Sequence, residues 1–576
     1  MLLSNLDLLA TAPGGVARLR ELILTLAVQG KLVPQDPADE PASVLLQKIR
    51  AEKDRLIAEG KIKRDKPLAA IAEEEKPFGL PQGWEWVRLF ELLPDFQNGA
   101  SSRGDVGGRP VTVLRLADIK NRRISLNDTR QIPIAESDIR KYQLREGDIL
   151  ITRVNGSADI VGQFNLCDTA VDAIYCDHFI RMRVSAQWVE PTFLTLLSES
   201  SLMRQRVKEL FITTAGQKTV NQGHIGSLRF ALPPLAEQSR IVTRVEELMR
   251  LCDALEAKGQ LEAAQHAQLV STLLGALTAS TTPEELADHW QRVAQHFDLL
   301  AGRPAAIDAL EQTLLQLAVR GLLVPQDPTD EPASALLQKI RAEKDRLIAT
   351  GQIKRDKPLP PITDEEKPFE LPVGWEWVRL QQAYDVRDGT HDTPKYQSTG
   401  FPLVTSKNLY GGVLDLSDVK LISPADHEQI SARSRVNRDD ILFAMIGSIG
   451  NPVIVDTDTE FSVKNVALFK YYAAALSCPK YLLLVLQAEA AGMKERAAGG
   501  VQSFISLGQL RSSVVALPPL SEQSRIVSRV TALRRRCADL GQRLAERQSV
   551  QARLAEALVA NNAQTSTQQE DECHAA

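Results

Sequence analysis

The residues whose spacing best suits catalysis lie in two copies of a charged linker. Glu74-Glu75-Lys76 and Glu365-Glu366-Lys367 each contain the Glu-x-Lys spacing that nucleases use. Both triplets stand among Lys, Glu and Pro residues, a composition typical of an extended, solvated connection. We interpret these carboxylates as solvated, and keep a nuclease acting through them as an alternative.

Other catalytic chemistry finds little support. His178 and His224 could act as bases, but no Ser or Cys partner arrangement recurs in the second half of the chain. The sequence has no GxxxxGK[ST] loop, no GxGxxG after a strand and no Asn/Asp-Pro-Pro-aromatic motif of an amino-methyltransferase. The six cysteines are scattered without a CxxC pair, which argues against zinc and disulfides and fits a reducing cytoplasm. We therefore predict no catalytic residue, no metal and no cofactor.

Composition places the chain among globular proteins of several domains. At 576 residues it exceeds one core, and about 150 residues per domain suggests roughly four units. No apolar run reaches the ~18 residues of a membrane span, and the start lacks the pattern of a signal peptide. The net charge of −5 gives no basic footprint for nucleic acid.

A large internal repeat organises the chain. The segment LAVQGKLVPQDPADEPASVLLQKIRAEKDRLIAEGKIKRDKPL begins at Leu26, and a near-identical segment begins at Leu317, 291 residues later. The pair EEKPFGLPQGWEWVRL and EEKPFELPVGWEWVRL keeps this offset, and ALPPLAEQSRIVTRV recurs as ALPPLSEQSRIVSRV. Two stretches of about 140 residues between these segments barely resemble each other. Similar frames around divergent blocks indicate two equivalent scaffold positions with two different targets.

This plan predicts six segments. They are a helical repeat segment with linker (1–83), a first block (84–235), central helices with the second helical segment and linker (236–374), a second block (375–520), a C-terminal helix (521–560) and a disordered tail (561–576).

The frames read as helices and the blocks as compact α+β domains. After Pro234 and Pro519, apolar residues recur at spacings of four and three, which predicts two long helices that pack on each other as an antiparallel coiled coil. Gly30 and Gly321 fit helix ends. Each block has short β-rich runs, a helical stretch and a Gly-rich turn, so we expect a common fold with different loops, repeated with pseudo-twofold symmetry.

The ordered motifs resemble a known family. A (G/D)DIL strand, an AGQK or GGVQ turn and LPPLxEQxxIVxRV occur twice. The segment GKLVPQDPxDEPAxxLLxKIRAEK stands before the first block, and the second block is preceded by the same pattern with Leu322 in place of the lysine. This order is similar to the specificity subunits of type I restriction–modification enzymes, although many members carry the VPQDP segment at the C-terminus instead. The resemblance implies two target-recognition domains that read a bipartite double-stranded DNA site, helices that set the gap, two methyltransferase subunits and motor-nuclease subunits as partners, and no membrane.

If the blocks read DNA, their base contacts should come from donors and acceptors near glycine-containing loops. The alternative to each contact is simple solvation, and a coiled-coil scaffold without DNA is the alternative to the function. The candidates are Arg103, Arg153, Asn155, Gln217 and Lys218 in the first block, and His391, Lys395, Lys407, Asn408 and Gln502 in the second.

Overall fold

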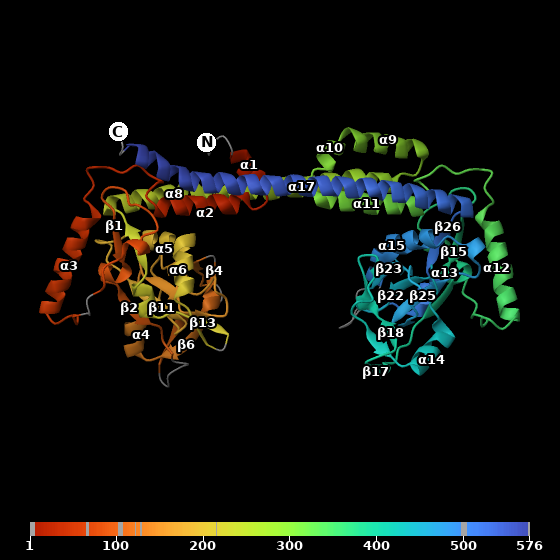
Figure 1. Ribbon diagram of the computed structural model, residues 1–576, viewed down its shortest axis with the longest axis horizontal. Helices are drawn as coiled ribbons and strands as arrows, with labels where there is room; N and C mark the ends of the chain where they lie inside the picture. Colours follow the sequence, from red (N-terminus) through yellow and green to blue (C-terminus); the bar gives the residue numbers. More distant parts are fainter. Residues whose placement is uncertain are drawn as a thin grey trace. The chain divides into compact units, whose positions relative to one another are not determined.

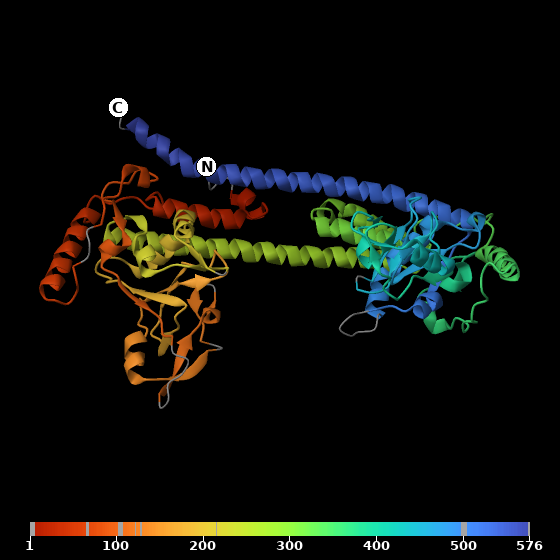
Figure 2. The same ribbon diagram turned by 60° about the horizontal axis from the view of Figure 1, so that its bottom comes forward.

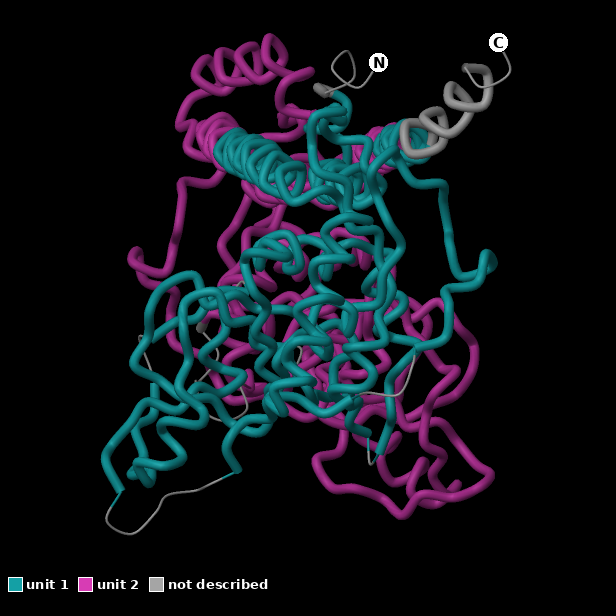
Figure 3. Tube along the Cα trace, turned by 90° about the vertical axis from the view of Figure 1, so that its left-hand side faces the viewer, with its two compact units in different colours: residues 1–262, 548–576 teal, residues 263–547 magenta. Residues whose placement is uncertain are grey.

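The computed structural model describes residues 6–64, 68–101, 108–120, 122–126, 129–214, 216–447, 449–496 and 504–573. The chain forms two compact units: unit 1 comprises residues 1–262 and 548–576, and unit 2 comprises residues 263–547 (Figure 3). Two long helices, α8 (Leu235–Ala279) and α17 (Leu520–Cys573), each contribute to both units.

Unit 1 is built around a four-stranded antiparallel sheet in the order β2-β11-β7-β9. Its strands are β2 (Asp95–Asn98), β7 (Ile149–Thr152), β9 (Phe164–Leu166) and β11 (Phe179–Arg183). A three-stranded sheet, β10-β3-β6, adds the parallel pair β3 and β10. The other elements are β1 (Glu85–Arg88), β3 (Arg109–Leu114), β4 (Ile119–Lys120), β5 (Arg123–Ile124), β6 (Arg130–Ile134), β8 (Val154–Asn155), β10 (Ala173–Tyr175), β12 (Ile212–Thr214), β13 (Gln217–Thr219), β14 (Arg229–Leu232), α1 (Leu6–Thr11), α2 (Gly15–Val28), α3 (Ala42–Ala58), α4 (Glu136–Tyr142), α5 (Pro191–Glu199), α6 (Ser201–Glu209) and α7 (Gln222–Gly226).

Unit 2 repeats this plan (Figures 1 and 2). Its central antiparallel sheet has the order β16-β25-β22-β23, and a second sheet, β17-β21-β18-β24, contains the parallel pair β18 and β24. The elements are β15 (Glu376–Arg379), β16 (Asp385–Asp388), β17 (Tyr396–Gln397), β18 (Phe401–Val404), β19 (Leu409–Tyr410), β20 (Val413–Leu414), β21 (Lys420–Ile422), β22 (Ile441–Ala444), β23 (Gly450–Ile454), β24 (Ser462–Val463), β25 (Val466–Lys470), β26 (Val514–Leu517), α9 (Pro283–Gln295), α10 (Phe297–Leu300), α11 (Pro304–Val319), α12 (Ala333–Ala349), α13 (Leu380–Ala383), α14 (Pro424–Ser434), α15 (Pro479–Arg496) and α16 (Leu507–Ser512).

The repeated DIL motif anchors each central sheet. Asp148 is fully buried, and its carboxylate accepts from Arg183 Nε at 2.5 Å and Nη2 at 2.7 Å. In unit 2, Asp440 accepts from Lys470 Nζ at 2.5 Å. Burial raises the pKa of Asp440, while Lys470 opposes that rise. Each motif therefore ties β7 or β22 to its neighbouring strand, so its role is structural.

A third helix joins the long helices in each unit. In unit 1, Arg20 of α2 pairs with Asp253 at 2.7 Å on α8, and Arg18 of α2 pairs with Glu556 at 3.3 Å on α17. In unit 2, α8 packs its Leu274 with Cys537 and Leu544 of α17 and with residues of α11. The predicted contact between the long helices is confirmed, but each unit forms a bundle of three helices rather than an isolated pair.

The predicted glycine stops are also confirmed. Helix α2 ends at Val28, and Gly30 has φ +72°, a left-handed conformation that disfavours other residues. A Cβ at Gly30 would lie 2.5 Å from Pro81 Cγ, so the turn also needs the missing side chain. Gly321 follows α11 with the same geometry. At the C-terminus, helix α17 continues to Cys573, through the segment for which the sequence predicted disorder.

Among the described residues, no helix is long and apolar enough to cross a membrane.

Candidate nucleic-acid interface

Several loops of unit 1 meet at one end of its central sheet. The ends of β2 and β7 and the start of β11 lie there because these strands run antiparallel. Arg153 N donates to His178 O at 2.7 Å, and Val220 N donates to Arg153 O at 2.9 Å, which joins three of these segments. We call residues 98–101, 115–118, 153–156, 176–178 and 216–222 the first loop edge.

The structure brings four predicted residues together on the first loop edge. Lys218 pairs with Asn155 across β13 and β8, and its ammonium donates to Gly156 O at 3.0 Å. Arg153 donates from Nη1 to Asp177 O at 3.2 Å, and Gln217 is exposed. Arg153, Asn155 and Lys218 are half-buried, and together with the exposed Gln217 they place several polar groups on neighbouring loops.

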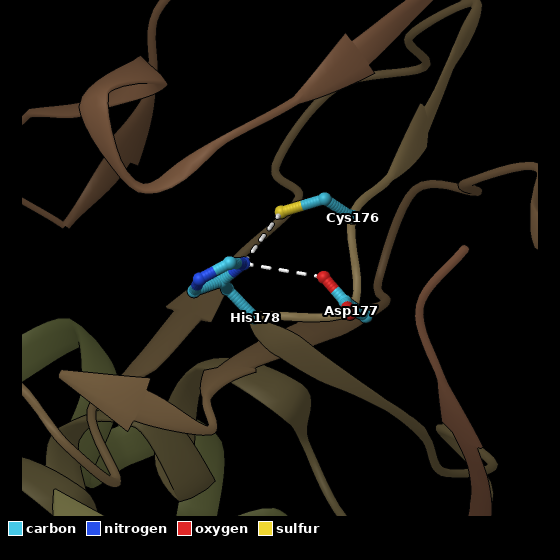
Figure 4. Close-up of side chains that lie close together, drawn as sticks. All are labelled: Cys176, Asp177 and His178. Carbon is cyan, nitrogen blue, oxygen red and sulfur yellow. Dashed lines mark hydrogen bonds and ion pairs between the residues drawn. The ribbon is translucent and has the colours of Figure 1, made fainter. Parts of the chain in front are cut away.

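The loop before β11 adds His178, which the sequence offered as a possible base, together with its neighbours Cys176 and Asp177. The donor atoms of Cys176, Asp177 and His178 lie within 4.8 Å of one another (Figure 4). His178 Nδ1 is 3.2 Å from Asp177 Oδ1 and 3.7 Å from Cys176 Sγ. Burial raises the pKa of the Cys176 thiol, which disfavours the thiolate that a metal needs. We therefore describe this cluster as a polar part of the loop edge.

Two half-buried side chains fix the geometry of the first loop edge and of segment 158–161, which directly follows one of its loops. Arg204 donates to the carbonyl oxygens of Val161, Ala158 and Asp159 at 3.0–3.1 Å, and burial lowers its pKa. Gln222 Nε2 donates to Asn98 Oδ1 at 3.0 Å. The side chain of Arg204 is thus committed to loop geometry.

Unit 2 has a matching second loop edge, residues 388–395, 405–408, 445–447, 464–465 and 504–506. Met445 N lies 3.4 Å from Asn465 O, as Arg153 N contacts His178 O in unit 1. Ile505 N donates to Met445 O at 3.0 Å, as Val220 N donates to Arg153 O in unit 1. A Cβ at Gly389 would lie 2.0 Å from Val463 O, and one at Gly99 would lie 2.0 Å from Cys176 O. The backbone frame is therefore common, while the side chains on it differ.

His391 lies at the centre of the second loop edge. Its Nε2 is 2.9 Å from Asp388 Oδ2, and its Nδ1 is 3.0 Å from Asn465 Oδ1. Arg433 also reaches Asp388, at 3.3 Å, and Lys464 donates to Thr393. The His391 side chain remains 61% exposed, so this network orients it without covering it.

The remaining described candidates of unit 2 differ in accessibility. Lys395 is exposed, and Lys407 is exposed with an ion pair to Asp418 at 3.1 Å. Asn408 is only 3% exposed; it donates to the carbonyl oxygens of Asp415 and Asp418 and accepts from Thr405 N. Because both ends of this amide are engaged inside the loop, we leave Asn408 out of the proposed contacts.

Two candidates, Arg103 and Gln502, lie outside the described residues. Conversely, the sequence missed Lys464, Asn465, Asn98 and Gln222, which occupy the loop edges. Lys464 and Asn465 directly precede the strand run VALFK, and that position was the available signal. Asn465 also has φ +55°, which no sequence pattern had indicated.

The two Glu-x-Lys segments serve the fold. Glu75 forms an ion pair with Arg229 and lies 3.7 Å from Arg88. Glu366 accepts from Arg379 at 2.9 Å, and this hydrogen bond lowers the pKa of Glu366. The described geometry thus engages both glutamates with arginines, rather than leaving them simply solvated as expected.

The comparisons with known proteins agree with this architecture. Residues 112–265 and 372–547 match the type I restriction modification DNA specificity domain. The chain is 38% identical over 570 residues to the specificity subunit of the type I restriction enzyme EcoAI of Escherichia coli, covering 94% of this chain and 93% of the relative. It is 35% identical over 572 residues to the EcoEI specificity subunit of Escherichia coli, with the same coverage.

Among solved structures, the HsdS subunit from Thermoanaerobacter tengcongensis aligns with 85% of this chain and 98% of its own, at 18% identity and a TM-score of 0.40. The matched segments and the relatives show that the chain belongs to the type I restriction–modification DNA specificity family. It is a DNA specificity subunit, a non-catalytic part of such a system.

Proposed function

We propose that each loop edge reads one half of a bipartite double-stranded DNA site. The proposal is supported by the observation that the two loop edges share one backbone arrangement but present different side chains. Arg153 and His178 in unit 1 are replaced by Met445 and Asn465 in unit 2 at the same hydrogen bond. Because the backbone arrangement is common, both units approach DNA in the same way. Because the side chains differ, each unit recognises its own short DNA sequence.

The exposed and half-buried polar groups of the two loop edges suit direct reading of base edges. Arg and Lys donate to guanine, Asn and Gln pair with adenine, and the major groove distinguishes all four base pairs. The first loop edge offers Arg153, Asn155, Gln217 and Lys218, and the second offers His391, Lys395 and Lys407. The exposed ion pair between Lys407 and Asp418 costs little to open, since such pairs contribute about 0–1 kcal/mol.

The long helices supply the second element of the proposal. Helices α8 and α17 are continuous through the places where the chain passes from one unit to the other. We assign to them the length of the unread gap between the half-sites, because a helix advances ~1.5 Å per residue.

The partners belong to the same proposal. Two methyltransferase subunits bind the repeated frames, and motor-nuclease subunits join the assembly. Methyl donor, ATP and magnesium act in those partners. The free cysteines Cys167, Cys176, Cys252, Cys478 and Cys537 fit the reducing cytoplasm, where we place the complex.

Selection of bound fragments from random double-stranded DNA tests this function. The purified complex with its methyltransferase should enrich two short words separated by a gap of fixed length and random sequence. Enrichment of one continuous word, or no enrichment, would overturn the proposal. Incubation of the chain alone with DNA and magnesium tests the nuclease alternative, which predicts cleavage that Glu75→Gln and Glu366→Gln abolish.

A further inference from the structure

One short turn has the same backbone in both loop edges and carries different side chains. It follows β3 in unit 1, at residues 115–118, and β18 in unit 2, at residues 405–408. In each turn the N–H of the last residue donates to the carbonyl oxygen of the first residue at 3.0 Å. The last residue, Asp118 or Asn408, is only 3% exposed, and its side chain accepts from the N–H of the first residue at 2.7 Å or 3.0 Å. The turn is therefore closed in the same way in both units.

In unit 1 this turn also holds an arginine, Arg115, where unit 2 has Thr405. The guanidinium forms a fork with Asp118: its Nε donates to Oδ2 at 3.1 Å, and its Nη2 donates to Oδ1 at 3.0 Å. The Arg115 side chain is nevertheless 43% exposed. Because the guanidinium is planar and rigid, a fork through Nε and Nη2 turns the edge formed by Nη1 and Nη2 away from the carboxylate. The turn thus fixes the direction of a partly exposed arginine.

Closure of the turn does not require this arginine. Unit 2 closes the same turn with Thr405 and Asn408, and the Asn408 amide donates to carbonyl oxygens of its own loop. Arg115 and Asp118 together carry no net charge, as Thr405 and Asn408 carry none. The two turns therefore differ in what the first side chain presents, while their backbone and net charge are the same.

Arg115 lies among the other polar groups of the first loop edge. The residue before it, Leu114, accepts through its carbonyl oxygen from Cys176 N at 3.0 Å. Two residues further along, His178 O accepts from Arg153 N at 2.7 Å. These backbone hydrogen bonds place the turn beside the loops for which we propose base contacts.

The ion pair with Asp118 favours a base edge over a phosphate as the ligand of Arg115. Phosphate contacts depend on positive charge, and Asp118 offsets the charge of Arg115. Base edges carry no net charge, so a contact with them depends on the direction of its hydrogen bonds. Guanine presents two neighbouring acceptors, O6 and N7, which match an arginine fork, whereas adenine presents a donor beside its N7.

We propose that Arg115 reads a guanine in the half-site of unit 1, and that Asp118 is the residue that positions it. The inference rests on the proposed function and adds one base and the pair of side chains that recognises it. Because unit 2 has Thr405 at this place, the contact belongs to one half-site only.

Two variants separate base reading from the effects of charge and folding. Arg115→Thr with Asp118→Asn gives unit 1 the pair that unit 2 already carries, so the net charge and the closure of the turn are kept. Asp118→Asn alone adds one positive charge and removes the fork. It should strengthen a phosphate contact, but it should weaken the reading of a guanine. Arg244→Thr with Glu247→Gln on α8 is the matched control, since these residues form an exposed pair of the same spacing at 3.0 Å.

Selection from random double-stranded DNA by the purified complex with its methyltransferase gives the two recognised sequences. Fluorescence anisotropy with single-base changes then measures discrimination at each base pair. The wild type and the control should prefer G·C to A·T by about 5- to 150-fold at one position of one half-site. Both Asp118→Asn and the double variant of the turn should lose most of this preference and keep every other position.

An unchanged preference in either variant would overturn the inference, as would uniform weakening at all positions. Tighter binding of Asp118→Asn with unchanged recognised sequences would also overturn it, since this is the behaviour of a phosphate contact. If the wild-type complex enriched no bipartite site, the proposed function would fail as well.

Discussion

The indole of Trp84 donates from Nε1 to Glu237 Oε2 at 3.0 Å, in a buried contact between the GWEW and LPPLxEQ motifs. Unit 2 repeats it between Trp375 and Glu522 at 2.9 Å. In each unit the other carboxylate oxygen accepts from a glutamine of the VPQDP segment, at 3.1 Å and 3.2 Å. This relationship explains why three motifs far apart in the sequence recur together: they form one buried polar junction.

Trp84→Phe should destabilise unit 1, because it leaves Glu237 Oε2 buried without its donor. An unsatisfied buried acceptor costs about 1–3 kcal/mol. Hydrogen–deuterium exchange of peptides from β1 and β14 measures the effect locally. Trp86→Phe is the control, since Trp86 packs on Phe78 in the same strand region. Equal exchange in the two variants would contradict the importance of the junction.

The same junction should make this defect depend on pH. Burial raises the pKa of Glu237 and Glu522 above their ordinary value of 4.5, and the Trp and Gln hydrogen bonds oppose the rise. A raised folded pKa gives stability that is present below the unfolded pKa and is lost as pH rises through the folded pKa. Loss of the Trp84 donor raises the folded pKa further. The defect of Trp84→Phe should therefore grow as the pH rises above the ordinary glutamate value of 4.5. A defect that shrinks as the pH rises would contradict the assignment.

Variants of Asn408 and Lys407 should separate effects on folding from effects on DNA recognition in unit 2. Asn408→Ala should lower the stability of the segment 405–418 by about 1–3 kcal/mol, because several backbone groups lose their partner. Lys407→Ala should leave stability unchanged and weaken DNA binding. Thermal unfolding and fluorescence anisotropy with the selected DNA measure the two effects. Reversed results would show that Asn408 reads DNA and Lys407 supports the fold.

Gln217→Ala with Lys218→Ala should impair reading of one half-site only. A good bidentate base contact contributes about 1–3 kcal/mol of discrimination. Binding to DNA with single-base changes in each half-site measures this loss, and Lys395→Ala should show the opposite pattern. If the double variant left discrimination unchanged in both half-sites, this loop would make no base contact.

Insertion of one heptad into both long helices tests their role as spacers. Seven residues placed after Glu262 in α8 and after Arg547 in α17 keep the repeat of the packing seam. At ~1.5 Å per residue, the gap should lengthen by about three base pairs of ~3.4 Å, with both words intact. Selection of bound DNA fragments measures the length of the gap. If the recognised DNA sequences changed while the gap between them stayed the same, the helices would not set the spacing.

The sequence predicted the frame more completely than the contacts. Repeated motifs located the two blocks, the glycine stops and the long helices, because helix periodicity and turn chemistry are local properties. The junction of Trp84 with Glu237 joins residues 153 apart and depends on tertiary packing. The same limit applies to Asn408: its residue type suggested a contact with DNA bases, but its side chain is buried. It also applies to Asn465, which lies beside His391 only because the sheet aligns loops that are distant in the sequence.

Methylation mapping in a host with the complete system shows whether each loop edge reads its own half-site. Three versions of the chain are compared: wild type, the Gln217→Ala and Lys218→Ala double variant, and His391→Ala. We expect a bipartite methylated site, with relaxed sequence in one half for the Gln217→Ala and Lys218→Ala variant and in the other half for His391→Ala. Relaxation of both halves by either variant, or of the same half by both, would contradict the assignment of one loop edge to each half-site.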